Sequence, residues 1–156
     1  MFYKKITNIE IAEQQLFHAI SLYVEGTYMV SAITLAGATE EVLGKMLDDR
    51  SKTRALDEVV NRLCCMYEHI FKEPANRKDF VNLRNKAKNA LKHMDKPSIE
   101  LDLEKDAVQI ISRAISNYKK VKSNLRIKQC KPFFEFDKIR VRRYHERCRD
   151  GEEPLP

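Results

Sequence analysis

Apolar residues recur along this chain at steps of three and four, the period of an amphipathic α-helix. Within residues 8–25 the recurring set comprises Ala12, Leu16, Ala19, Ile20 and Tyr23. Thr7 or Asn8 is suited to cap the start of this helix, and Gly26 to end it, because glycine readily adopts the left-handed conformation that closes helices. The pattern predicts a first helix over residues 8–25 with one buried face.

The same period predicts four further helices, over about residues 28–49, 53–72, 76–93 and 103–125. The second of them is apolar around much of its circumference, which is typical of the central helix of a bundle. Glu40 and Glu41 interrupt that apolar surface, and a buried carboxylate needs a hydrogen-bond donor or a cation. We therefore expect at least one of the two to form an ion pair with a neighbouring helix.

The third and fifth helices each have a predicted core face. In the third helix the face comprises Leu56, Val59, Val60, Leu63, Cys64, Tyr67 and Ile70. In the fifth helix it comprises Ala107, Ile110, Ile111, Ala114, Ile115 and Tyr118. Amphipathic helices joined by short connections predict an all-α fold, an antiparallel bundle of four to five helices over residues 1–125.

Residues 126–149 form a basic C-terminal extension with 9 cations and 3 anions. Phe133, Phe134 and Phe136 need burial, either at the end of the bundle or against a partner. From Ile139 onward, alternating apolar and basic residues are compatible with a short strand or a helix. We expect the extension to pack on the bundle or on a partner, and residues 150–156 to be disordered.

Composition limits the kinds of partner and the cellular location that we expect for the protein. The net charge of +6, concentrated in the extension, favours an anionic partner, nucleic acid before a membrane surface. The chain has no apolar run of about 18 residues and no signal peptide, so neither a membrane span nor secretion is expected. The four cysteines form no C-x-x-C pair and the four histidines are scattered, so the spacing of these residues does not predict a metal site. We expect a cytoplasmic protein that uses no metal or cofactor.

Candidate chemistry gathers in the fourth predicted helix, in a run of seven cations within residues 77–96. His93 follows Asn89 by one helical turn, and Lys88 precedes that asparagine. Advancing the helix by about 100° per residue places four polar side chains on one stripe that faces away from the core. These are Asn82, Lys86, Asn89 and His93. The ladder of amide, ammonium and imidazole groups is suited to phosphate and ribose.

Two cations of the same helix lie beside this stripe. Lys92 falls about 60° from His93 on the helical wheel. Arg84 sits nearer the core edge, where it is better placed to pair with Glu40 or Glu41 than to join the stripe. The sequence thus predicts Arg84 as the fourth-helix partner of Glu40 or Glu41.

The segment Lys88-Asn89-Ala90-Leu91-Lys92-His93 resembles the Arg-Asn-x-x-x-His motif of the HEPN domains, which are all-α bundles. Lys88 stands where that motif has arginine. Residues 32–44, AITLAGATEEVLG, are also similar to an uncharacterised bacterial group within or beside the family. Together with the order of the helices, the resemblance covers residues 8–125.

The resemblance implies metal-independent RNA cleavage, of a toxin or defence type, or RNA binding. The site of cleavage would form at a cleft where the motif-bearing helices of a homodimer meet. His93 would be the general base or acid, Asn89 would orient it or the phosphate, and Lys88 would stabilise the developing negative charge. Supporting positions are Glu40, Glu41, Arg84 and Lys92. An antitoxin or another protein would be a further partner.

Two alternatives remain open at this point. Lysine offers phosphate a single point charge rather than the planar fork of arginine, so the protein could bind RNA or a nucleotide without cleaving it. The three phenylalanines of the extension instead favour a dimeric adaptor that engages another protein.

Overall fold

Helices account for all regular secondary structure in the computed structural model, which describes residues 3, 5–93, 97–123 and 130–153. The helices are α1 (Asn8–Glu25), α2 (Met29–Asp48), α3 (Ala55–Phe71), α4 (Arg77–His93), α5 (Leu103–Val121) and α6 (Lys131–Arg149). The all-α prediction is confirmed for these residues. The predicted count of four to five is one helix short, because the basic extension contributes α6.

The ends of α1 are fixed by local chemistry. Thr7 caps the helix by accepting from the backbone N–H of Glu10, and the Glu10 side chain accepts from the backbone N–H of Thr7 in return. Gly26 closes the helix with φ of 75°. The five residues predicted as the core face of α1 are the five that the structure buries.

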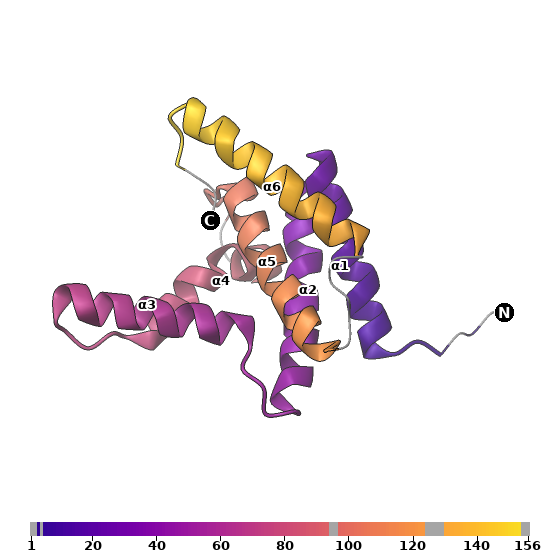
Figure 1. Ribbon diagram of the computed structural model, residues 1–156, viewed down its shortest axis with the longest axis horizontal. Coiled ribbons are helices and arrows are strands. Elements are labelled where there is room, and N and C mark those ends of the chain that lie inside the picture. The colour runs from indigo at the N-terminus through magenta and orange to yellow at the C-terminus, as the bar shows by residue number, and fades with distance from the viewer. Residues whose placement is uncertain (1–2, 4, 94–96, 124–129, 154–156) are drawn as a thin grey trace.

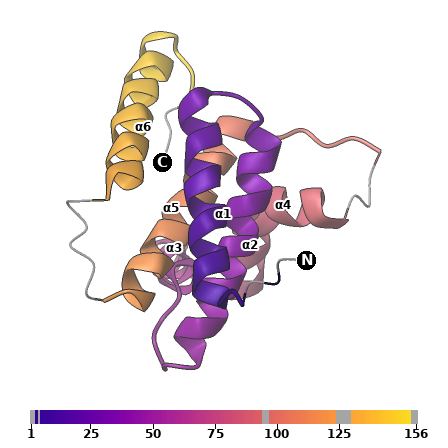
Figure 2. The ribbon, with the colours of Figure 1, turned by 90° about the vertical axis from the view of Figure 1, so that its right-hand side faces the viewer.

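Helix α2 occupies the centre of the molecule, packed against α1 on one side, α5 on another, and crossed by α4 (Figures 1 and 2). Its predicted central position is confirmed. Small residues along it, including Ala32, Ala36 and Gly37, are buried and let neighbouring elements come close. All six predicted core residues of α5 are buried as well.

Helices α3 and α4 form a hairpin whose closed end projects away from the other helices (Figure 1). The prediction of a continuous core face on α3 is therefore wrong. Val60 is its one predicted core residue that is buried, whereas Ile70 is 62% exposed. The physical reason is the angle at which α3 leaves the bundle, since its outer half packs on α4 alone and on no layer beyond it.

Helix α6 lies across α1 (Figure 1). The described part of the extension is therefore a helix and not a strand, the two alternatives that the sequence left open. Phe133 and Phe136 are buried, with Phe136 packed on Tyr23 at 5.2 Å between ring centroids. Phe134 remains 66% exposed. Residues 126–129 and 154–156, parts of the predicted extension and tail, lie outside the described residues. None of the described helices is long and apolar enough to cross a membrane.

Candidate functional site

The polar stripe predicted for α4 is present in the structure. Asn82, Lys86, Asn89 and His93 are all exposed. His93 is the last residue of α4, and this end of the helix projects past α2 (Figure 2). The stripe is therefore open to a large ligand along its length.

Lys88 points away from that stripe and toward α2. Its side chain is 12% exposed, and its Nζ lies 3.6 Å from Oε2 of Glu40 and 3.4 Å from Oε1 of Glu41. The aliphatic stem crosses Gly37, where an added Cβ would meet Lys88 Cγ and Cδ at 2.9 Å. The absence of a side chain at Gly37 is thus what lets Lys88 reach both carboxylates.

Glu40 is the buried carboxylate that the sequence predicted, with a side chain 5% exposed. Its main partner is Arg113 of α5, whose Nε and Nη2 donate to the two carboxylate oxygens at 2.6 and 3.2 Å. The same guanidinium donates from Nη1 to the backbone oxygen of Arg84 at 3.1 Å. A planar fork on a carboxylate gives two charge-assisted bonds and fixes orientation as well as charge. Glu40 and Arg113 therefore tie α2, α4 and α5 together.

Sequence reasoning did not find Arg113. It interrupts the core face of α5 next to Ala114, and the prediction that Glu40 or Glu41 needs a cation was the one signal that could have pointed to it. The helical wheel instead indicates Arg84 of the fourth helix as the partner of Glu40 or Glu41.

Glu41 joins the cluster from the solvent side. Lys88 and Lys92 each place Nζ 3.4 Å from one of its oxygens. Burial opposes ionisation of Glu41, but the two ammonium groups together outweigh it and lower the pKa of this carboxyl. The predicted ion pair of Glu40 or Glu41 with a neighbouring helix is thus present, but Lys88 and Lys92 supply the cations on α4.

Arg84 does not take the role predicted for it. Its Nη1 donates to Oε1 of Gln109 on α5 at 2.8 Å, while Lys88 and Arg113 occupy Glu40. Burial, and then the positive charge of Arg113, lower the pKa of the Arg84 guanidinium. The reason for the correction is geometric: α4 crosses α2 so that position 88 faces Glu40 and position 84 faces α5.

The predicted site residues thus divide into two sets. Lys88 and Lys92 meet Glu40 and Glu41 in one ion-pair cluster. Within the described ranges, no side-chain hydrogen bond or ion pair ties Asn89 or His93 to that cluster. The cluster braces α4 against the bundle, and the two exposed groups remain available to an incoming molecule.

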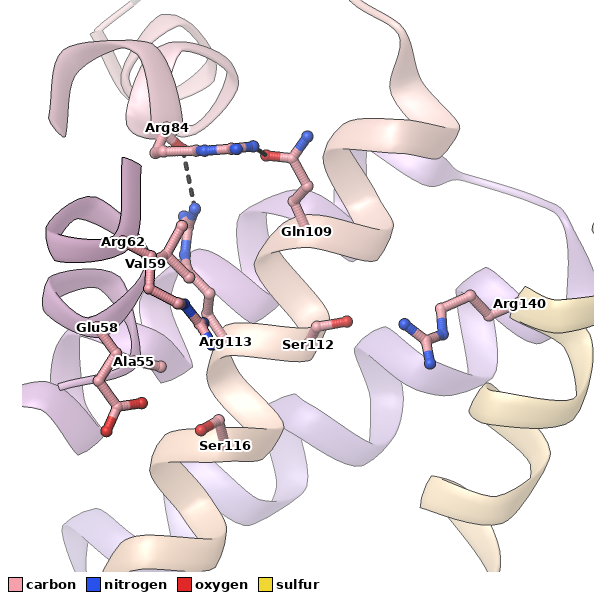
Figure 3. Close-up of a pocket in the computed structure, with 10 residues that line it drawn as sticks. All are labelled: Ala55, Glu58, Val59, Arg62, Arg84, Gln109, Ser112, Arg113, Ser116 and Arg140. Atoms are coloured by element: carbon pink, nitrogen blue, oxygen red, sulfur yellow. Dashed lines mark hydrogen bonds between the residues drawn. The ribbon is translucent and has the colours of Figure 1, made fainter. Parts of the chain in front are cut away.

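A second feature of the surface is a pocket of about 280 Å³ where α3, α4, α5 and α6 come together (Figure 3). Its floor is the face of α5 that bears Gln109, Ser112 and Ser116. Four arginines surround it, one from each of the four helices, and we call it the arginine pocket. Its lining comprises Ala55, Glu58, Val59, Arg62, Arg84, Gln109, Ser112, Arg113, Ser116 and Arg140.

The described residues hold no cluster of three or more His, Cys, Asp or Glu side chains that could bind a metal ion. Comparison of the chain with protein families, with curated proteins and with solved structures found no match.

Proposed function

We propose that this protein acts on RNA through the exposed stripe of α4, as a metal-independent endoribonuclease of a toxin or defence type in the cytoplasm. The observation that carries the proposal is the exposure of His93 one turn after Asn89 on a polar, basic helix face. The HEPN-like motif that contains both residues supports the same reading. Neutral imidazole is suited to proton transfer because its ordinary pKa lies near the working pH.

In the proposed reaction, His93 removes the proton from a ribose 2′-hydroxyl. The freed oxygen attacks the adjacent phosphorus, the bond from phosphorus to the 5′-oxygen breaks, and that oxygen takes up a proton. Asn89, one turn away, hydrogen-bonds the phosphate or holds the imidazole in position. The products are a 2′,3′-cyclic phosphate and a 5′-hydroxyl.

The phosphorane needs a cation to stabilise its negative charge, and the carboxylates of α2 limit which lysine of α4 is free to supply it. Lys88 already faces Glu40 and Glu41, so its charge is largely committed. Lys92 is more accessible, with a side chain 56% exposed. Because one chain presents one His93, we propose that two copies meet along α4 and supply the base and the acid together. An antitoxin or other protein that covered this face would silence the activity.

The test is incubation of the purified protein with tRNA and mRNA in EDTA. His93→Ala should lower the cleavage rate by about 10² or more, the usual contribution of a general acid or base. His69→Ala is the matched control, because His69 is an exposed histidine of α3. Equal cleavage by the wild-type and His93→Ala proteins would remove this mechanism.

A second candidate is RNA binding without cleavage. The observation that favours it is the pairing of Lys88 with two carboxylates, which commits the charge of the residue that stands where the motif has arginine. Binding driven by phosphate contacts weakens as salt rises, because counterions are released. A gel-shift titration at several salt concentrations, with intact RNA recovered afterwards, would identify this function; salt-independent binding would reject it.

The adaptor alternative rests on the three phenylalanines of the extension. Phe133 and Phe136 pack into the core of the same chain, and Phe134 is the one of the three at the surface for a partner to contact.

A further inference from the structure

The arginine pocket is separate from the α4 stripe, since neither Asn89 nor His93 lines it. Figure 3 shows Arg62 and Arg140 reaching from opposite sides toward the face of α5 that bears Ser112, with Arg84 above. We infer that this pocket binds a phosphate monoester group, a function that goes beyond the proposed action of α4 on RNA.

The balance of charge in the pocket is the first argument. Four guanidinium groups line it, and Glu58 is its one lining carboxylate. That carboxylate is already paired with Lys120 at 2.7 Å, so it does not neutralise the arginines. Glu40 neutralises Arg113 from behind. Arg140 lies 3.4 Å from a carboxylate oxygen of Asp137, so the excess of positive charge that a dianion would offset rests on Arg62 and Arg84.

Arg84 is a guanidinium of the pocket whose positive charge is not balanced by a carboxylate of the described residues. Within the described part of the chain, neither Arg84 nor Arg62 forms an ion pair with a carboxylate. The Nε of Arg84 is buried without a hydrogen-bond partner. A buried hydrogen-bond donor without an acceptor costs free energy. Burial and the like charge of Arg113 both disfavour the charged form of the Arg84 guanidinium. A bound phosphate would supply the missing counter-charge.

The chemistry of the lining is suited to a phosphate group. Arginine presents a planar fork of donors that matches phosphate oxygens, and it does so better than lysine. Ser112 and Ser116 add hydroxyl donors from the floor, one helical turn apart. Val59 and Ala55 provide an apolar wall for the organic part of the ligand. The volume of about 280 Å³ is at the lower end for small-molecule sites, which suits a group of this size.

The test is isothermal titration of the full chain, at constant ionic strength, with inorganic phosphate, AMP and adenosine. Saturable binding of phosphate and AMP, without binding of adenosine, is the expected result and identifies a small phosphate ligand. A parallel arm compares one short RNA with a 5′-phosphate and with a 5′-hydroxyl. Preference for the phosphorylated end alone supports the same pocket chemistry, with an RNA terminus as its source.

Variants locate the binding. Arg62→Gln and Arg140→Gln should each weaken binding by about tenfold or more, the loss expected for one charge-assisted contact. Arg149→Gln removes the same charge from an exposed position at the end of α6 and should leave affinity unchanged. Absence of saturable binding to any phosphate ligand, or equal weakening by Arg149→Gln, would overturn the inference. No arm depends on RNA cleavage, so its outcome is independent of the α4 activity.

Discussion

Glu40 is a buried carboxylate in the interior of this bundle. It brings a negative charge to the contact of three helices, where Arg113 and Lys88 meet it. Buried ion pairs contribute little net stability compared with apolar packing, but breaking one leaves an uncompensated charge. Arg113, with 4% of its surface exposed, would be left in that position without Glu40.

At this scale we predict that Glu40→Gln lowers the free energy of unfolding by about 3–5 kcal/mol, the usual cost of removing one partner of a buried pair. The matched control is Glu41→Gln on the next residue, whose side chain is 42% exposed. It should cost about 1 kcal/mol or less, because exposed ion pairs contribute little. Urea unfolding followed by circular dichroism measures both. Similar losses in the two variants would show that the Arg113 pair is not the anchor that its geometry indicates.

Helix α6 is the element whose role changed most between sequence and structure. Its start is held by aromatic packing. The ring centroid of Phe133 lies 5.7 Å from that of Tyr118 and 5.9 Å from that of Phe17. Its end is held by Arg147, which donates two hydrogen bonds to Asp102 at the start of α5. Helix α6, the described part of the basic extension, is thereby part of the packed structure.

At this scale we predict a large difference between two phenylalanines of α6. Phe136→Ala should lower the free energy of unfolding by about 3–5 kcal/mol, because it empties a site in the core beside Tyr23. Phe134→Ala should change it by about 0.5 kcal/mol or less, since that ring is exposed. Thermal unfolding of both variants measures the difference. A small effect of Phe136→Ala would mean that α6 does not stay docked in solution.

The molecule as a whole carries several carboxyls whose pKa values depend on the fold. A hydrogen bond from Tyr118 lowers the pKa of Glu13, and hydrogen bonds from Arg147 lower the pKa of Asp102. Burial raises the pKa of Glu41, but the charges of Lys88 and Lys92 outweigh this effect and lower it. Asp106 is the opposite case, because burial and the nearby charge of Asp102 raise its pKa.

A carboxyl with a lowered pKa stabilises the fold above about pH 4, the ordinary unfolded value, and this contribution is lost as the pH falls through its folded-state pKa. Asp106 has the reverse sign and gains stability on acidification. With three groups against one, the melting temperature should fall steeply below about pH 4. Asp102→Asn should flatten this dependence, while Glu73→Gln, at an exposed loop position, should not. Unchanged slopes for Asp102→Asn in calorimetric scans from pH 7 to pH 3 would contradict the assignment.

The sequence by itself determined the five helices within residues 8–125 and the residues that α1 and α5 bury. Their apolar positions follow the helical period, and short-range capping by Thr7 and Gly26 sets the ends of α1, so local information sufficed. It also determined that His93 and Asn89 share an exposed stripe, because the angular position of residues within one helix depends on that helix alone.

Only the tertiary structure decided which helices face each other. It placed Lys88 rather than Arg84 over Glu40, brought Arg113 across from α5, and left the outer half of α3 without a core to cover. The arginine pocket arises in the same way, from four helices that contribute one guanidinium each. Such contacts depend on crossing angles between elements distant in the chain, and no helical periodicity encodes those angles.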